Sequence, residues 1–142
     1  MRVGALLVMT GLVLVGGTAA AAPKALSIVG QWRGVYECSQ GRTALTLTVS
    51  DAGSGKLKAR FDFGPLPDNP LVPTGAFLMD GKLDAKTRRV TFHAGKWINQ
   101  PVNYFTVDLE GYIEASGNRI TGVVPSAGCS VFDLARGEAL VG

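Results

Sequence analysis

The chain has 142 residues, with 14 Lys or Arg, 11 Asp or Glu, two cysteines and one histidine. This length allows a single domain. So few cysteines and histidines exclude most metal sites and catalytic Cys/His machinery, and we expect neither a metal nor a cofactor. The longest basic run is Arg88-Arg89, and no stripe interleaves basic and aromatic residues, so nucleic-acid binding is not expected.

The first 22 residues have the order of a secretory signal. Arg2 precedes an apolar run and then a stretch of small residues. The run is about twelve residues long, whereas a membrane span needs roughly 20. We expect a signal peptide over residues 1–21, cleaved after Ala20 or Ala21, and a periplasmic or secreted protein without a transmembrane segment. An uncleaved N-terminal anchor is the alternative. Without Arg2 the net charge is about +2.

Eight later segments alternate apolar and polar residues, a period of two that indicates strands with one buried face. They are 31–38, 43–50, 57–63, 76–83, 89–94, 105–113, 119–124 and 130–136. The pattern predicts an all-β domain, either a sandwich or an antiparallel barrel. We favour an eight-stranded up-and-down barrel over residues 30–136, because every connection can be a hairpin. An extension, 22–29, would precede it and a tail, 137–142, would follow; the only helical candidate is 134–140.

The two cysteines provide a check on this layout. Export would place them in an oxidising compartment, where an even pair usually forms a disulfide. Cys38 ends the first predicted strand and Cys129 opens the eighth at the same rim. The first and last strands of a closed barrel are neighbours, so the layout brings the sulfurs together. We predict a structural disulfide; a redox-active pair is the alternative, although no CxxC motif is present.

The predicted connections divide into two unequal rims. Short turns share one rim, and the other, here called the long-loop rim, receives residues 39–42, 64–74, 95–104 and 125–128. Long loops on a rigid scaffold are the usual place for function. Aromatic faces and amides there are typical of a sugar or peptide contact surface. The candidate binding residues are Trp97, Tyr104, Asn99, Gln100, Asn103 and Asn69. The alternative is that Trp97 and Tyr104 cap the core.

Catalysis finds little support in the sequence. His93 is predicted to face outward, and the chain has no G-x-S-x-G, H-E-x-x-H or P-loop pattern. Asp68 and Asp108 are a strand length apart in the predicted layout, so no carboxylate pair is evident. We predict no catalytic residues and no enzymatic activity.

Residues 30–49 resemble the opening of a secreted bacterial β-module with the pattern W-x-G-x-Y-x-C-x-Q-G-x-T-x-L-T-L. The matching positions are Trp32, Gly34, Tyr36, Cys38, Gln40, Gly41, Thr43, Leu45, Thr46 and Leu47. The resemblance continues through FDFGPLPDNPLVPTGAF, KWINQPVNY, GNRITGVV and GCSVFDLAR. It implies the same module and fold and transfers no activity. Such modules occur alone or appended to other exported or regulatory domains.

A looser similarity is to the periplasmic inhibitors of secreted alkaline metalloproteases, which are small barrels with a G-x-W motif like Gly30-Gln31-Trp32. Their disulfide closes a short loop, whereas Cys38 and Cys129 lie at opposite ends of this domain. Their N-terminal trunk blocks the protease, and residues 22–29 could act so only by analogy. We expect a monomeric binding module that contacts a protein or cell-envelope glycan. The alternatives are an inhibitor of a secreted hydrolase and a carrier of a small apolar ligand.

Overall fold

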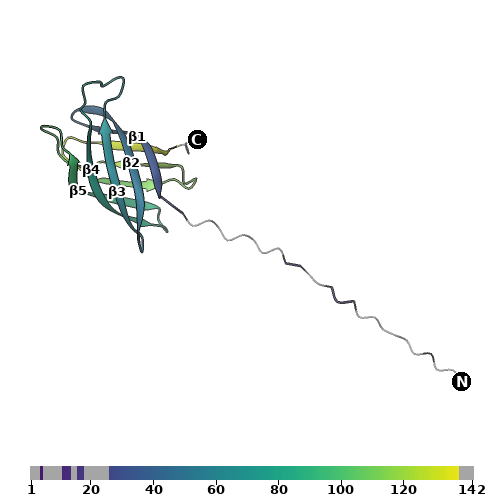
Figure 1. Ribbon diagram of the computed structural model, residues 1–142. Helices are drawn as coiled ribbons and strands as arrows, with labels where there is room; N and C mark the ends of the chain where they lie inside the picture. The colour runs from purple at the N-terminus through teal and green to yellow at the C-terminus, as the bar shows by residue number, and fades with distance from the viewer. Residues whose placement is uncertain (1–3, 5–10, 14–15, 18–25, 138–142) are drawn as a thin grey trace, which may run out of the picture.

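The structure, a computed structural model, describes residues 4, 11–13, 16–17 and 26–137. Most of the predicted signal peptide and the tail beyond residue 137 lie outside the described residues. The strands are β1 (Gly30–Cys38), β2 (Gly41–Gly53), β3 (Lys56–Gly64), β4 (Gly75–Asp84), β5 (Arg89–Asn99), β6 (Leu109–Ile113), β7 (Arg119–Val123) and β8 (Val131–Arg136). Each pairs antiparallel with the next, and β1 pairs with β8 (Figure 1). The predicted eight-stranded up-and-down barrel is confirmed.

The alternation in the sequence places one face of each strand inside the barrel. On β2, Leu45, Leu47 and Val49 are buried, while their neighbours lie toward the outside. The centre is filled by large side chains that are almost fully buried: Trp32, Phe61, Phe77 and Phe92. Phe61 and Phe77 stack with ring centroids 4.4 Å apart. An eight-stranded barrel is narrow enough for such side chains to fill its interior.

The boundary between β5 and β6 differs from the sequence prediction. β5 continues through Asn99, and β6 begins only at Leu109, so the connection is 100–108 rather than 95–104. The β5–β6 ladder stops at Phe92 and Leu109 because the Asp108 carboxylate accepts the Ala94 N–H at 2.8 Å. That side-chain bond replaces the main-chain pairing that the alternation had suggested.

The helical candidate 134–140 is not borne out in its described part, since β8 runs through Arg136. Residues 138–140 lie outside the described residues. No helix among the residues that the structure describes is long and apolar enough to cross a membrane.

Residues 26–29 close the short-turn end of the barrel. The Trp32 indole N–H donates to the Ile28 carbonyl at 2.8 Å, and Ile28 is buried. The Arg136 guanidinium lies 4.3 Å from the centre of the Trp32 ring. It also donates to the carbonyls of Ser27 at 2.6 Å and Val29 at 3.0 Å. This part of the predicted extension is therefore fixed against the first and last strands.

Gly34 permits β1 and β8 to approach closely. A Cβ at Gly34 would lie 1.9 Å from the Asp133 carbonyl oxygen, so Gly34→Ala must push the strands apart. We expect the free energy of unfolding to fall by about 3 kcal/mol, measured by urea unfolding. In the control, Gly64→Ala, the new Cβ would lie 3.5 Å from Thr74 Oγ1, an ordinary contact. Equal stability of the two variants would contradict the steric role of Gly34.

Candidate functional site

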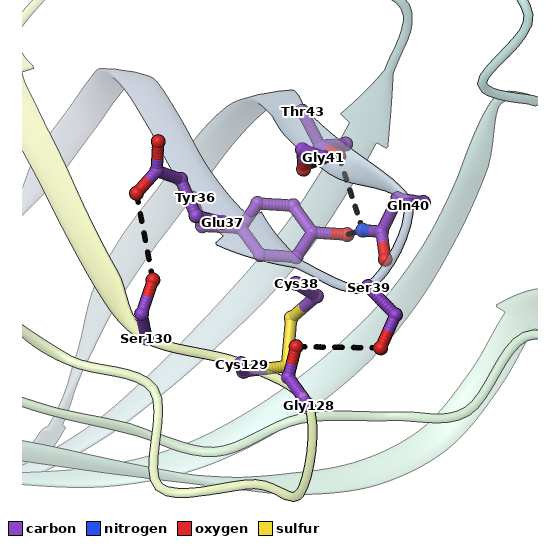
Figure 2. Close-up of a disulfide and its surroundings, with 10 residues drawn as sticks. All are labelled: Tyr36, Glu37, Cys38, Ser39, Gln40, Gly41, Thr43, Gly128, Cys129 and Ser130. Carbon is purple, nitrogen blue, oxygen red and sulfur yellow. Dashed lines mark hydrogen bonds between the residues drawn. A yellow bond between two sulfur atoms is a disulfide. The ribbon is translucent and has the colours of Figure 1, made fainter.

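A disulfide joins the two ends of the barrel at the long-loop rim. Cys38 at the end of β1 is bonded to Cys129, which precedes β8, as predicted. Beside it, the Ser130 N–H donates to the Glu37 carbonyl at 2.9 Å, and the Ser130 hydroxyl donates to the Glu37 carboxylate at 3.4 Å (Figure 2). Covalent and hydrogen bonds together hold the 124–130 connection against β1.

The turn between β1 and β2 is organised by Gln40. Its amide N–H groups donate to the Tyr36 hydroxyl at 3.3 Å and to Thr43 Oγ1 at 3.0 Å (Figure 2). Thr43 is fully buried, and its own hydroxyl donates to the Gly41 carbonyl at 3.1 Å. Burial raises the pKa of Tyr36 well above its usual value, with a further contribution from Tyr104, while the hydrogen bonds oppose the shift. The phenol therefore stays neutral.

The loop 64–74 is attached to the same turn. The Asn69 side-chain amide donates to the carbonyls of Gln40 and Arg42, each at 2.8 Å. Arg42 forms an ion pair with Asp68 at 2.6 Å, and Val72 is buried. The loop is thus fixed by contacts with β2 and the core. Asn69, a predicted ligand-binding residue, is engaged by the protein's own main chain.

Trp97 and Tyr104 cover the core at the long-loop rim. The Trp97 ring is half-buried and meets Phe63 and Phe77 edge to face, at centroid distances of 6.2 and 5.1 Å. The Tyr104 ring stacks on Phe63 at 5.5 Å. Trp97 lies on β5, where it pairs with Phe77, and not in a loop as the sequence had suggested. The geometry gives Trp97 the role of a cap.

The remaining predicted amides have different surroundings. Asn99 donates to the Thr74 carbonyl at 3.2 Å, and Gln100 donates to the Tyr104 carbonyl at 3.1 Å, so both side chains brace loops. Asn103 is exposed and has a left-handed backbone with a φ of 63°. Asparagine tolerates this conformation better than most residues.

A pocket of about 610 Å³ lies beside the disulfide. It is lined by Tyr36 and Cys38, by Ser39 and Gln40, by residues 103–107, and by Ser126, Ala127 and Cys129. Of the predicted binding residues it contains Tyr104 and Asn103, and the other four lie outside it. Its other lining residues, above all Gln40 and Phe105, were not among the predicted binding residues. A cysteine beside a turn at each end of the domain, Cys38 before residues 39–40 and Cys129 after residues 126–128, was the available signal.

The histidine and carboxylate side chains considered for acid–base chemistry lie outside the pocket. His93 is exposed on β5, and its Nδ1 lies 3.1 Å from the Asp108 carboxylate. Asp68 is paired with Arg42. Among residues 26–137 no group of three or more His, Cys, Asp or Glu side chains could hold a metal ion.

Comparison of the chain with known protein families, with curated proteins and with solved structures finds no match.

The capping role of Trp97 predicts a loss of stability. Trp97→Ala removes the contacts with Phe63 and Phe77, and we expect the free energy of unfolding to fall by about 2 kcal/mol. Ile98→Ala, at the neighbouring and outward-facing position, should cost less than about 1 kcal/mol. Denaturant unfolding measures both. A Trp97→Ala protein as stable as the Ile98→Ala protein would rule out the cap.

The raised pKa of Tyr36 predicts a loss of stability at alkaline pH. The unfolded chain ionises this phenol near pH 10, whereas the folded protein keeps it protonated. The contribution of the Tyr36 phenol to the free energy of unfolding is therefore complete below about pH 10. Above that pH it declines by up to about 1.4 kcal/mol per pH unit. Unfolding free energies from pH 8 to 11 should fall more steeply for the wild type than for Tyr36→Phe. Tyr112→Phe, on the outer surface, controls for loss of a hydroxyl; parallel slopes for all three proteins would contradict the prediction.

Proposed function

We propose that the chain is an exported, non-enzymatic binding module whose long-loop rim contacts a protein or glycan partner in the periplasm or outside the cell. One observation carries this proposal. Within residues 26–137 the three most exposed large apolar side chains, Leu71, Val102 and Phe105, all come from the long loops of that rim. Their exposed fractions are 93%, 85% and 83%.

Single exposed apolar residues are normal on a protein surface, whereas exposed apolar side chains that gather into a patch mark an interaction site. Here Phe105 lines the pocket, and Leu71 is carried by the loop that the Asn69 side chain fixes to the Gln40 carbonyl. A fixed loop loses little conformational entropy on binding, so more of the contact energy contributes to affinity.

Two observations support export and the absence of catalysis. The Cys38–Cys129 disulfide is compatible with an oxidising compartment. The pocket is lined by no Asp, Glu, His, Lys or Arg, so it offers no side chain of the kinds that usually transfer protons near neutral pH.

The alternatives fit the described residues less well. A carrier needs internal space, but Trp32, Phe61 and Phe77 fill the barrel. A protease inhibitor of the trunk type needs a free N-terminal segment, but Arg136 and Trp32 hold residues 26–29.

Photo-crosslinking tests the contact face. A benzophenone amino acid is placed at Phe105 or, as the control, at Tyr112, an exposed aromatic residue on β6. After irradiation of the native cells we expect a discrete adduct from position 105 and none from position 112, because only the former lies on the long-loop rim. Adducts are analysed in the periplasmic and secreted fractions. Equal labelling from both positions, or none from 105, would refute the proposed contact face.

A further inference from the structure

The pocket beside the disulfide has no charged lining residue. Its twelve lining residues are aromatic, aliphatic, amide, hydroxyl or disulfide groups. The charged side chains nearest to it in the chain are engaged elsewhere: Glu37 with Ser130, Arg42 with Asp68, and Asp108 with His93. A charged ligand would lose water here without gaining an opposite charge. The lining therefore selects an uncharged ligand.

Two of the aromatic residues that line the pocket, Tyr104 and Phe105, come from the 100–108 connection. Phe105 is 83% exposed and is not part of the hydrophobic core. Tyr104 lines the pocket, and its ring stacks on the buried Phe63 with the ring centroids 5.5 Å apart, so the core fixes the orientation of the ring. Flat aromatic rings beside polar groups suit a ligand with one apolar face and a polar edge. A sugar ring has this division between its C–H face and its hydroxyl groups.

The polar groups of the pocket have free hydrogen-bonding capacity. Among residues 26–137 no hydrogen bond is made by the side chains of Asn103, Thr106 and Ser126. Gln40 uses its N–H groups on Tyr36 and Thr43, which fixes the orientation of its carbonyl oxygen. Amides and hydroxyls both donate and accept hydrogen bonds. Sugar hydroxyls also donate and accept hydrogen bonds, so each of these polar side chains can bond to a sugar without any charged group.

An extended peptide fits this site less well. The lining belongs to loops and to β1, which is paired with both β2 and β8. The site therefore offers no open strand edge for main-chain pairing with a peptide. At about 610 Å³ the pocket has the size of a small-ligand site.

We infer that this pocket binds an uncharged oligosaccharide, with a sugar ring against Phe105 and Tyr104 and its hydroxyls bonded to Asn103, Gln40 and Ser126. The inference rests on the proposed function, because it assigns a ligand class to the same rim.

The test is calorimetric titration of the purified full-length chain, with its disulfide intact. The probes are neutral trisaccharides of glucose, mannose, galactose, xylose and N-acetylglucosamine, with the galacturonic acid trimer as the charged comparator. We expect saturable binding of at least one neutral sugar and none of the acidic one. Binding of the acidic trimer alone, or of no neutral sugar, would overturn the inference.

Variants locate the binding to this pocket. Phe105→Ala should weaken the affinity about tenfold through loss of stacking, and Tyr112→Ala should leave it unchanged. Asn103→Gly removes the amide while allowing the left-handed backbone, so a loss of affinity reports the hydrogen bond rather than strain. Unchanged affinity in both pocket variants would place any sugar elsewhere and overturn the inference.

The crosslinked adduct separates this inference from the proposed function. An adduct from position 105 that glycosidases release and proteases do not supports both. An adduct that proteases degrade overturns the oligosaccharide and leaves the contact face standing. The absence of any adduct from 105, together with no sugar binding, refutes both.

Discussion

The pairing of β1 with β8 closes the barrel, and almost every other feature relies on that seam. Five residue pairs form it, from Trp32–Arg136 at one end to Tyr36–Phe132 at the other. In the middle, Gly34 lies so close to the Asp133 carbonyl that no side chain fits between the strands. Without the seam both strands would have an unpaired edge, which is exposed to aggregation, and the interior would be open to water.

The seam is fastened at both ends by different chemistry. At the short-turn end, Arg136 lies over Trp32 and donates to the carbonyls of Ser27 and Val29, so the chain leading into β1 is fixed together with the strand. At the long-loop end, the Cys38–Cys129 disulfide links the same two parts of the sheet. The pocket lies next to that covalent link, and both cysteines belong to its lining.

Charged side chains pair with one another on the outer wall and leave the pocket neutral. Among residues 26–137 the ion pairs are Arg42–Asp68, Lys58–Asp80, Arg60–Asp62, Arg89–Glu110, Arg119–Glu114 and Arg119–Asp133, and His93 lies beside Asp108. Exposed pairs of this kind contribute little to stability individually. At the long-loop rim, the side chains that line the pocket are amides, hydroxyls, aromatic rings, aliphatic groups and the disulfide.

The sequence by itself determined the number of strands, their order and the disulfide, but not where β5 ends and β6 begins. A period of two, short hairpins and the positions of two cysteines depend on local order along the chain. It did not determine which amides face a ligand. Asn69 and Asn99 bind carbonyls 25 to 29 residues away in the chain, and only the folded barrel brings these groups together. Phe105 continues the apolar alternation of β6, yet it lies before the start of the β5–β6 ladder and is exposed, whereas Val107 in the same segment is buried. The tertiary structure decided the pocket, since its walls come from segments that are distant in sequence.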